Sequence, residues 1–199
     1  KPKGHVDFKS HFYFQTPVWV AEAPMFLKNA IKVTDKYIKK ADKLLKDKLK
    51  DEPKWKKDIG TFGLSKHSES FSNDPKVKDL VQFIGQRSYE FLDWSGFNLQ
   101  NHSLHFTEFW VQEFSEKGGG HHSTHAHWNQ HVSGFYFLKC SDKTSYPVFH
   151  DPRPGSIMTK LPLKDDKQIS MGTSQVHYKP NPGTMIIFPG YVPHEYAVD

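Results

Sequence analysis

The stretch that decides the fold is GGGHHSTHAHWNQHVSGFYFLKC, residues 118–140, where five histidines fall within eleven residues ahead of an apolar, aromatic run. If residues 124–128 are extended, the period of two places His125 and His127 on the same face of a strand. Two imidazoles on one face can share a metal ion, and a third ligand must then come from elsewhere. The best candidate is His194 in FPGYVPHEY, which follows a predicted strand near the C-terminal end of the sequence.

The half of the sequence around this stretch is predicted to be all β. SLHFTEFWVQEF, residues 103–114, has the period of two that is typical of a strand. Further short strands are expected at about 123–128, 132–139, 146–150, 174–179 and 184–189. The breaker clusters DPRPG and NPG separate the later ones. Many short strands with polar turns indicate a sandwich or a barrel.

The N-terminal half is predicted to support that β structure with two helices. Apolar residues recur at three and four positions from Pro24 to about residue 49, with lysines on the other face. A second helix is expected from Pro75 to about residue 94, and an edge strand near 12–20 is interrupted by Pro17. The loop between the helices is expected to be pinned to the core by Trp55, Ile59 and Phe62. The pattern predicts one domain, 1–199, whose 1–100 part buttresses a jelly roll at 101–199.

Composition limits the classes of function. With 36% hydrophobic residues and a mean hydropathy of −0.69, the chain is expected to be soluble, without a membrane span or signal peptide. The one cysteine, Cys140, favours a reducing, cytoplasmic compartment. The net charge of +5 comes mostly from lysines between residues 28 and 57, while arginine occurs only at 87 and 153. This favours a solvated helix face over a functional anion-binding patch, and no nucleic-acid or membrane partner is expected.

A family resemblance is carried by three ordered motifs. They are TEFWVQEFSEKGGGHHSTHAHWNQHVSGFYFL, then YPVFHDPRP, then PGTMIIFPGYVPHEY, and together they cover residues 107–199. This part of the chain resembles the putative 2-oxoglutarate/Fe(II) oxygenases, in their prolyl-4-hydroxylase-like, H-x-H subfamily. The resemblance implies a double-stranded β-helix with Fe(II) and 2-oxoglutarate as cofactors. It further implies that O2 is used to hydroxylate a small-molecule or peptidyl substrate, whose identity stays open.

The same resemblance implies the metal ligands. His125 and His194 carry over directly, and His127 stands where the wider superfamily places an aspartate. Three neutral imidazoles leave such a site one negative charge poorer than two histidines and a carboxylate. Asp151 in FHDPRP is an alternative source of the carboxylate, but HDPRP first indicates a turn that ends a strand. The predicted metal ligands are therefore His125, His127 and His194.

The resemblance also raises the question of how 2-oxoglutarate is held. Related enzymes bind its distal carboxylate with a basic residue a few positions beyond the last histidine, and the five residues after His194 contain none. Lys139 is the best internal candidate, Tyr136 is a candidate hydroxyl donor, and Arg153 is less favoured. The favoured expectation is that a longer form supplies an arginine on one more strand.

Two other functions remain open at this point. A cupin-like metalloenzyme that uses zinc or iron without 2-oxoglutarate would suit the third histidine and the missing basic anchor. A non-catalytic metal-binding β-sandwich is favoured only if the histidines do not converge. A homodimer is compatible with every one of these interpretations.

Overall fold

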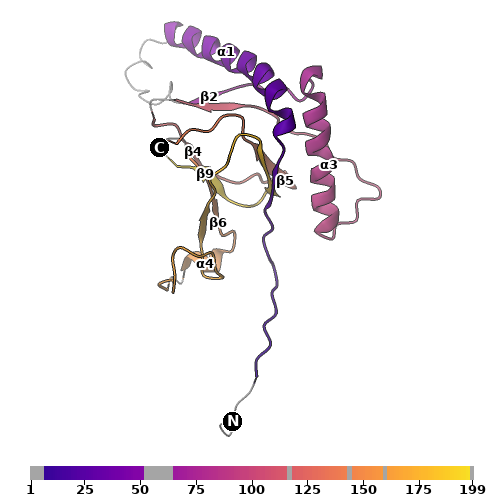
Figure 1. The fold of residues 1–199 in the computed structure, drawn as a ribbon, viewed down its shortest axis with the longest axis vertical. Coiled ribbons are helices and arrows are strands. Elements are labelled where there is room, and N and C mark those ends of the chain that lie inside the picture. The colour runs from indigo at the N-terminus through magenta and orange to yellow at the C-terminus, as the bar shows by residue number, and fades with distance from the viewer. Residues whose placement is uncertain (1–6, 52–64, 116–117, 143–144, 159–160, 198–199) are drawn as a thin grey trace.

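The computed structural model describes residues 7–51, 65–115, 118–142, 145–158 and 161–197. Trp55, Ile59 and Phe62, which were expected to pin a loop, lie outside the described residues. Figure 1 shows the two long helices at the outside of the strands, and an N-terminal segment that runs away from the body of the molecule. No helix in the described part of the chain is long and apolar enough to cross a bilayer.

Both predicted helices form within two or three residues of their predicted bounds. The short 3-10 helix η1 (Pro24–Phe26) leads into α1 (Leu27–Asp51). The 3-10 helix η2 (Pro75–Val77) leads into α3 (Lys78–Trp94). Asp74 caps η2, because its side chain accepts a hydrogen bond from the backbone N–H of Lys76. Tyr37 of α1 donates its hydroxyl to the same carboxylate at 3.0 Å, which ties the two helical segments together.

The strands form three antiparallel sheets. The first has the order β1 (Trp19–Glu22), β8 (Thr184–Pro189), β5 (Val132–Tyr136). The second has the order β4 (His122–His125), β9 (His194–Tyr196), β6 (Pro147–His150), β7 (Gln175–His177). The third pairs β2 (Ser65–His67) with β3 (Gln112–Phe114), and a short helix, α4 (Pro154–Met158), follows β6. The predicted mainly β, jelly-roll-like architecture with two supporting helices is confirmed.

Strand β8 separates two apolar clusters. Met185 and Ile187 face the helices and pack with residues such as Phe91 of α3. Ile186 and Phe188 face the opposite way. All six residues of β8 are buried, as expected for a strand covered on both faces. The side chains of β5, which pairs with β8, alternate in the same way, so the direction of each β5 side chain decides which cluster it joins.

Several strands are shorter than the sequence predicts, among them β5, which ends at Tyr136 rather than at 139, and β7, which spans only Gln175–His177. The N-terminal strand begins at Trp19, after Pro17, because Phe12 and Phe14 find no apolar face and are 60% and 92% exposed. Of residues 103–114, only Gln112–Phe114 is a regular strand. Strand β4 ends at His125 rather than at 128, and its partner β9 begins opposite, at His194. The residue before His194 is Pro193, which has no N–H to continue the ladder.

Candidate metal centre

The structure brings together His125, His127 and His194. Strand β4 lies antiparallel to β9, and His125 is directly opposite His194. One nitrogen from each of the three rings lies within 4.8 Å of the other two. The ring centroids are 4.3 Å apart for His125 and His194, and 5.1 Å apart for His125 and His127. Three nitrogen donors at this spacing can bind one cation between them.

Backbone carbonyls orient two of the rings. Nδ1 of His194 lies 2.9 Å from the carbonyl oxygen of Val192, and Nδ1 of His125 lies 2.8 Å from that of Ser123. A carbonyl oxygen only accepts, so in both rings Nδ1 must carry the proton. The lone pair of Nε2 is then free in each, which is the tautomer that a metal ligand needs.

A tight contact between two loops positions His127. The N–H of His127 donates to the carbonyl of Gly190 at 2.8 Å, and the N–H of Gly190 donates to the carbonyl of His131 at 3.1 Å. A Cβ at Gly190 would lie 2.3 Å from the carbonyl oxygen of Gln130, so only glycine fits. Since His194 follows four residues after Gly190, this contact holds the two ligand-bearing loops against each other.

Burial keeps two of the three candidate ligands, His194 and His127, uncharged. His194 is 1% exposed and packs against Phe135 and Phe188, with ring centroids 5.5 and 4.9 Å away. This burial lowers the pKa of His194 to about 4, and burial also lowers the pKa of His127. The two imidazoles are therefore neutral at pH 7, with lone pairs available to a metal ion.

The opposite face of the β4–β9 pair carries a second set of polar contacts. The hydroxyl of Thr124 donates to the carboxylate of Glu195, so the neighbours of His125 and His194 are bonded across the two strands. Nε2 of His150 lies 3.2 Å from the other oxygen of Glu195. These contacts lower the pKa of Glu195, chiefly through the Thr124 hydroxyl. They hold the register that places the two histidines opposite each other.

One neighbour of the three histidines was missed by the sequence reasoning. The ring of His122 stacks on that of His125, with centroids 4.3 Å apart and planes within 17°. Residues three apart on a regular strand face opposite sides, but the register shifts between His122 and His125. Nδ1 of His122 lies 3.1 Å from Oε1 of Gln112, whose amide donates to Ser65. No local pattern in the sequence signals this bulge.

Comparison with known families places this site in context. Residues 108–198 match the family described as Putative 2OG-Fe(II) oxygenase. The matched span contains all three histidines and strands β3 to β9. No curated protein matches the chain. The match supports the 2-oxoglutarate/Fe(II) oxygenase family, and the prolyl-4-hydroxylase-like, H-x-H subfamily stays a prediction.

The two residues predicted to bind the cosubstrate of that family do not lie with the histidines. On β5, Phe135 packs toward His194, so the next residue, Tyr136, faces the helices and joins their cluster. The Tyr136 hydroxyl donates to the carbonyl of Ala23 at 2.7 Å. Lys139 lies beyond the end of β5 and is exposed, with its ammonium 3.2 Å from Asp35 of α1. The side chains of Phe137 and Leu138 still alternate between the two clusters, so it is the ion pair with Asp35 that holds Lys139 at the outside.

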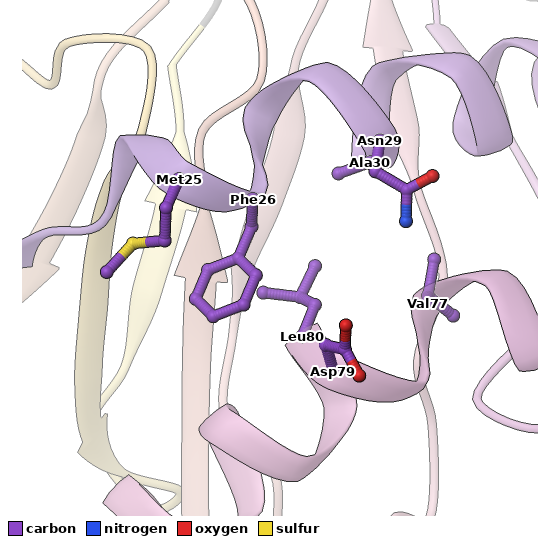
Figure 2. Close-up of a pocket in the computed structure, with 7 residues that line it drawn as sticks. All are labelled: Met25, Phe26, Asn29, Ala30, Val77, Asp79 and Leu80. Atoms are coloured by element: carbon purple, nitrogen blue, oxygen red, sulfur yellow. The ribbon is translucent and has the colours of Figure 1, made fainter.

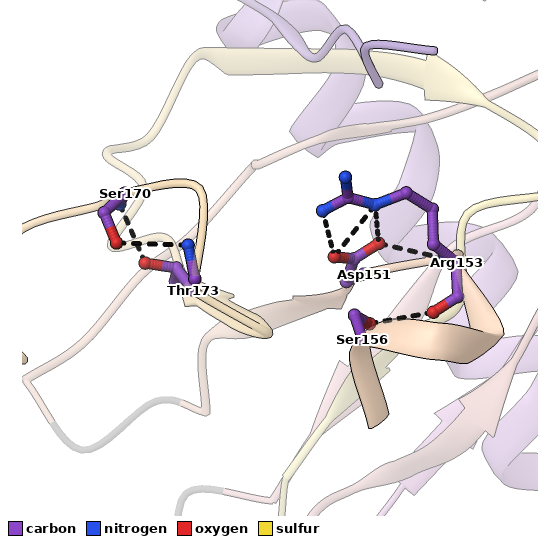
Figure 3. Close-up of polar contacts among 6 residues, drawn as sticks. Asp151, Arg153, Ser156, Ser170 and Thr173 are labelled. Atoms are coloured by element: carbon purple, nitrogen blue, oxygen red, sulfur yellow. Dashed lines mark hydrogen bonds and ion pairs between the residues drawn. The ribbon is translucent and has the colours of Figure 1, made fainter. Parts of the chain in front are cut away.

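Asp151, the alternative carboxylate, is engaged elsewhere. Figure 3 shows its carboxylate facing the guanidinium of Arg153, with Nη2 2.6 Å and Nε 2.9 Å from its oxygens. Asp151 also accepts from the backbone N–H of Arg153, which forms the turn that DPRP predicted. The side chain of Arg153 lowers the pKa of Asp151. Neither residue belongs to the group that can share a metal ion.

A pocket of about 170 Å³ lies away from the histidines, between the start of α1 and the start of α3. Figure 2 shows its lining, which comes from the helical segments alone: Met25, Phe26, Asn29, Ala30, Val77, Asp79 and Leu80. None of these residues is a candidate ligand. The pocket is a gap between packed helices on the other side of β8.

Proposed function

We propose that this protein is a non-haem Fe(II)- and 2-oxoglutarate-dependent oxygenase of the prolyl-4-hydroxylase-like, H-x-H subfamily. In this proposal it hydroxylates a small-molecule or peptidyl substrate, with His125, His127 and His194 as the metal ligands. The observation that carries the proposal is the convergence of these three histidines within the span that matches the oxygenase family.

The donor set fits a divalent first-row metal ion. Imidazole nitrogens suit iron and zinc, and two of the three rings present Nε2 because their Nδ1 atoms are held by carbonyls. Three ligands leave coordination positions open for a cosubstrate and for oxygen. The set differs from two histidines and a carboxylate, because no aspartate or glutamate among the described residues joins the group. Iron is therefore expected to be held less tightly than by the usual set.

The chain's own residues do the binding and the orienting in this mechanism. When bound, Fe(II) and 2-oxoglutarate supply the activation of O2 for hydroxylation. Val192 and Ser123 fix the ring orientations through their carbonyls, which spares reorganisation when the metal binds. Phe135 and Phe188 cover the inner side of His194 and exclude water there. Trp128, next to His127, is 88% exposed and offers an aromatic surface to a substrate.

The residue that would bind the distal carboxylate of 2-oxoglutarate is not assigned in this proposal. A buried carboxylate of 2-oxoglutarate would require a cation or several hydrogen-bond donors. The assignment of Lys139 stays a prediction, and it requires the ammonium to leave Asp35 and turn inward. Arg153 would likewise have to leave Asp151.

A second candidate function is a metalloenzyme that does not use 2-oxoglutarate. It is favoured by the all-histidine donor set, which is a known ligand set of catalytic zinc, and by the surface ion pair of Lys139. Under this alternative the histidines bind zinc or iron without any cosubstrate.

One pair of measurements distinguishes the two functions. Calorimetric titration under anaerobic conditions compares Fe(II) and Zn(II), and succinate release from 2-oxoglutarate is then measured with iron and O2. The matched control is His131→Ala, which removes an exposed histidine of the same loop. Iron binding with succinate release, lost in His194→Ala and kept in His131→Ala, is the expected result. Metal binding with no succinate release under any condition favours the second candidate.

A further inference from the structure

The outward face of α1 is a continuous stripe of lysines. In an α-helix each residue turns by about 100°, so positions can be placed around the axis. Seven residues fall within an arc of about 80°, spread over about 33 Å of helix, and no other residue type occurs in that arc. All seven are exposed lysines: Lys28, Lys32, Lys36, Lys39, Lys43, Lys46 and Lys50.

This stripe points directly away from the core. The buried residues of α1 lie on the opposite side of the helix, where Ala30 packs with residues of α3 and β8 and Val33 packs with Phe71 and Val77. Figure 1 shows α1 running along the outside of the molecule. The lysines therefore form the most prominent line of charge on this edge.

Five of the seven lysines are not neutralised. Lys46 pairs with Asp42 and Lys50 pairs with Asp47, both within the helix. Asp35, another acidic residue of α1, pairs with Lys139, which follows the end of β5. Among the residues that the structure describes, no ion pair involves Lys28, Lys32, Lys36, Lys39 or Lys43. Asp74 offsets part of the charge of Lys36, and the rest of the line has no ion-pair partner among the described residues.

The stripe extends sideways onto η2. The ammonium of Lys76 lies against that of Lys36 and lowers the pKa of Lys36 from its usual value. The carboxylate of Asp74 lies close enough to both lysines to offset part of this repulsion.

Such an arrangement is unfavourable for the isolated helix. Like charges three or four residues apart destabilise a helix, and the stripe contains such a pair at every step along its length. A helix that served only as a solvated surface would gain from alternating acidic and basic residues there. Because like charges are repeated along the whole stripe despite their cost to helix stability, we infer that these lysines have a function other than stabilising the fold.

We propose that the lysine stripe of α1 docks the protein on an anionic lipid bilayer, which departs from the sequence-based expectation of a solvated helix face and no membrane partner. A flat bilayer contacts a helix along the line of side chains that project furthest toward it, and along this stripe those side chains are all lysines. Lysine acts as a point charge and suits the diffuse field of an anionic bilayer. The binding is peripheral and electrostatic, because the apolar side of α1 is used by the core.

A nucleic acid fits the same stripe less well. The arc contains no arginine for bidentate contacts to bases or phosphates, and no aromatic ring on which a base can stack. The stripe offers positive charge without groups that recognise bases, which favours a bilayer surface over a nucleic acid as its partner.

The test uses the full chain with sedimentable vesicles of phosphatidylcholine, with and without phosphatidylserine. The stripe variant is Lys32→Gln, Lys36→Gln, Lys43→Gln. The matched control, Lys9→Gln, Lys164→Gln, Lys167→Gln, removes the same charge from other exposed positions. Glutamine keeps a good helix former in α1, and circular dichroism checks that all three proteins are folded.

The expected result is binding to the phosphatidylserine vesicles alone, weakened by salt. The stripe variant should bind about 100-fold more weakly, and the control should bind within about threefold of the parent protein. An equal loss in both variants would mean that only net charge matters and would overturn the proposal. So would failure of the parent protein to bind the anionic vesicles at low salt, or binding to duplex DNA in preference to them.

Discussion

His125 and His194 lie directly opposite each other across the antiparallel β4–β9 pair, with ring centroids 4.3 Å apart. The two ligands thus belong to one local unit, although 69 positions separate them in the sequence. Each is also held by a carbonyl two residues before it, Ser123 and Val192 respectively. Changes to the candidate centre therefore act on a preorganised pair, which leads to the following predictions.

The members of the H-x-H pair should differ in their tolerance of substitution. We expect His125→Ala to lower metal affinity by more than about 100-fold, since losing a ligand costs more than losing an outer partner. His127→Asp should retain Fe(II) and bind it at least as tightly, because the carboxylate restores the missing negative charge. Anaerobic titration with Fe(II) measures both. Retention in His125→Ala with loss in His127→Asp would show that the roles are reversed.

Gly190→Ala should destabilise the protein and disturb the site together. The new Cβ would lie 2.3 Å from the carbonyl of Gln130, so the two ligand-bearing loops must separate. We expect a loss of about 1–3 kcal/mol in the free energy of unfolding, measured in urea, with weaker metal binding. The control is Gly85→Ala in α3, where the nearest atom is an ordinary 3.7 Å away. That change should be neutral or stabilising by up to about 1 kcal/mol.

The metal-free protein should lose stability in mild acid. The folded-state pKa of His194 is about 4, below its ordinary value of 6.5. Between these values the unfolded chain binds a proton that the folded chain does not, so stability falls as pH falls from 6.5 to 4. The contribution of this group is at most about 3 kcal/mol. Urea unfolding at several pH values measures it. His194→Phe should reduce the slope without abolishing it, because burial also lowers the pKa of His122 to about 4, and His131→Ala should leave the slope unchanged.

Lys139→Ala should have little effect on 2-oxoglutarate binding. The ammonium is exposed and paired with Asp35, and surface ion pairs of this kind contribute about 0–1 kcal/mol. We expect the affinity for 2-oxoglutarate to change less than about twofold. Titration of the iron-loaded protein measures it, with Lys179→Ala as a control. A tenfold or greater loss in Lys139→Ala alone would make Lys139 the anchor after all.

Asp151→Asn should leave metal binding intact. The Asp151 carboxylate accepts hydrogen bonds from the Arg153 guanidinium and from the Arg153 backbone N–H in the turn after β6, and it is not part of the group of histidines. We expect the same Fe(II) affinity within about twofold, with faster proteolysis of the segment after β6 as its turn loosens. A strong loss of iron in Asp151→Asn, with the fold preserved, would identify Asp151 as a ligand.

The sequence by itself determined the elements whose signals are local. The period of three and four residues placed α1 and α3, and apolar runs between turn signals placed β5 and β8. The residue pattern also pointed to the three histidines. However, His127 lies beyond the end of β4 and is positioned by its contact with Gly190 rather than by a strand face shared with His125. The lysine stripe could equally be read from residue numbers, since the turn of a helix is constant.

Tertiary structure decided whatever depends on a partner far away in the chain. Strand β4 ends at His125 because Pro193 stands before His194 on its partner, and the stacking of His122 on His125 needs a register shift that no local pattern signals. Lys139 extends outward because its ammonium pairs with Asp35 of α1, a partner 104 positions away in the sequence. Backbone periodicity belongs to a single segment, whereas register, strand ends and charge partners are set by contacts between segments. The helices and the candidate ligands could therefore be predicted from the sequence, whereas strand ends, register and ion-pair partners required the structure.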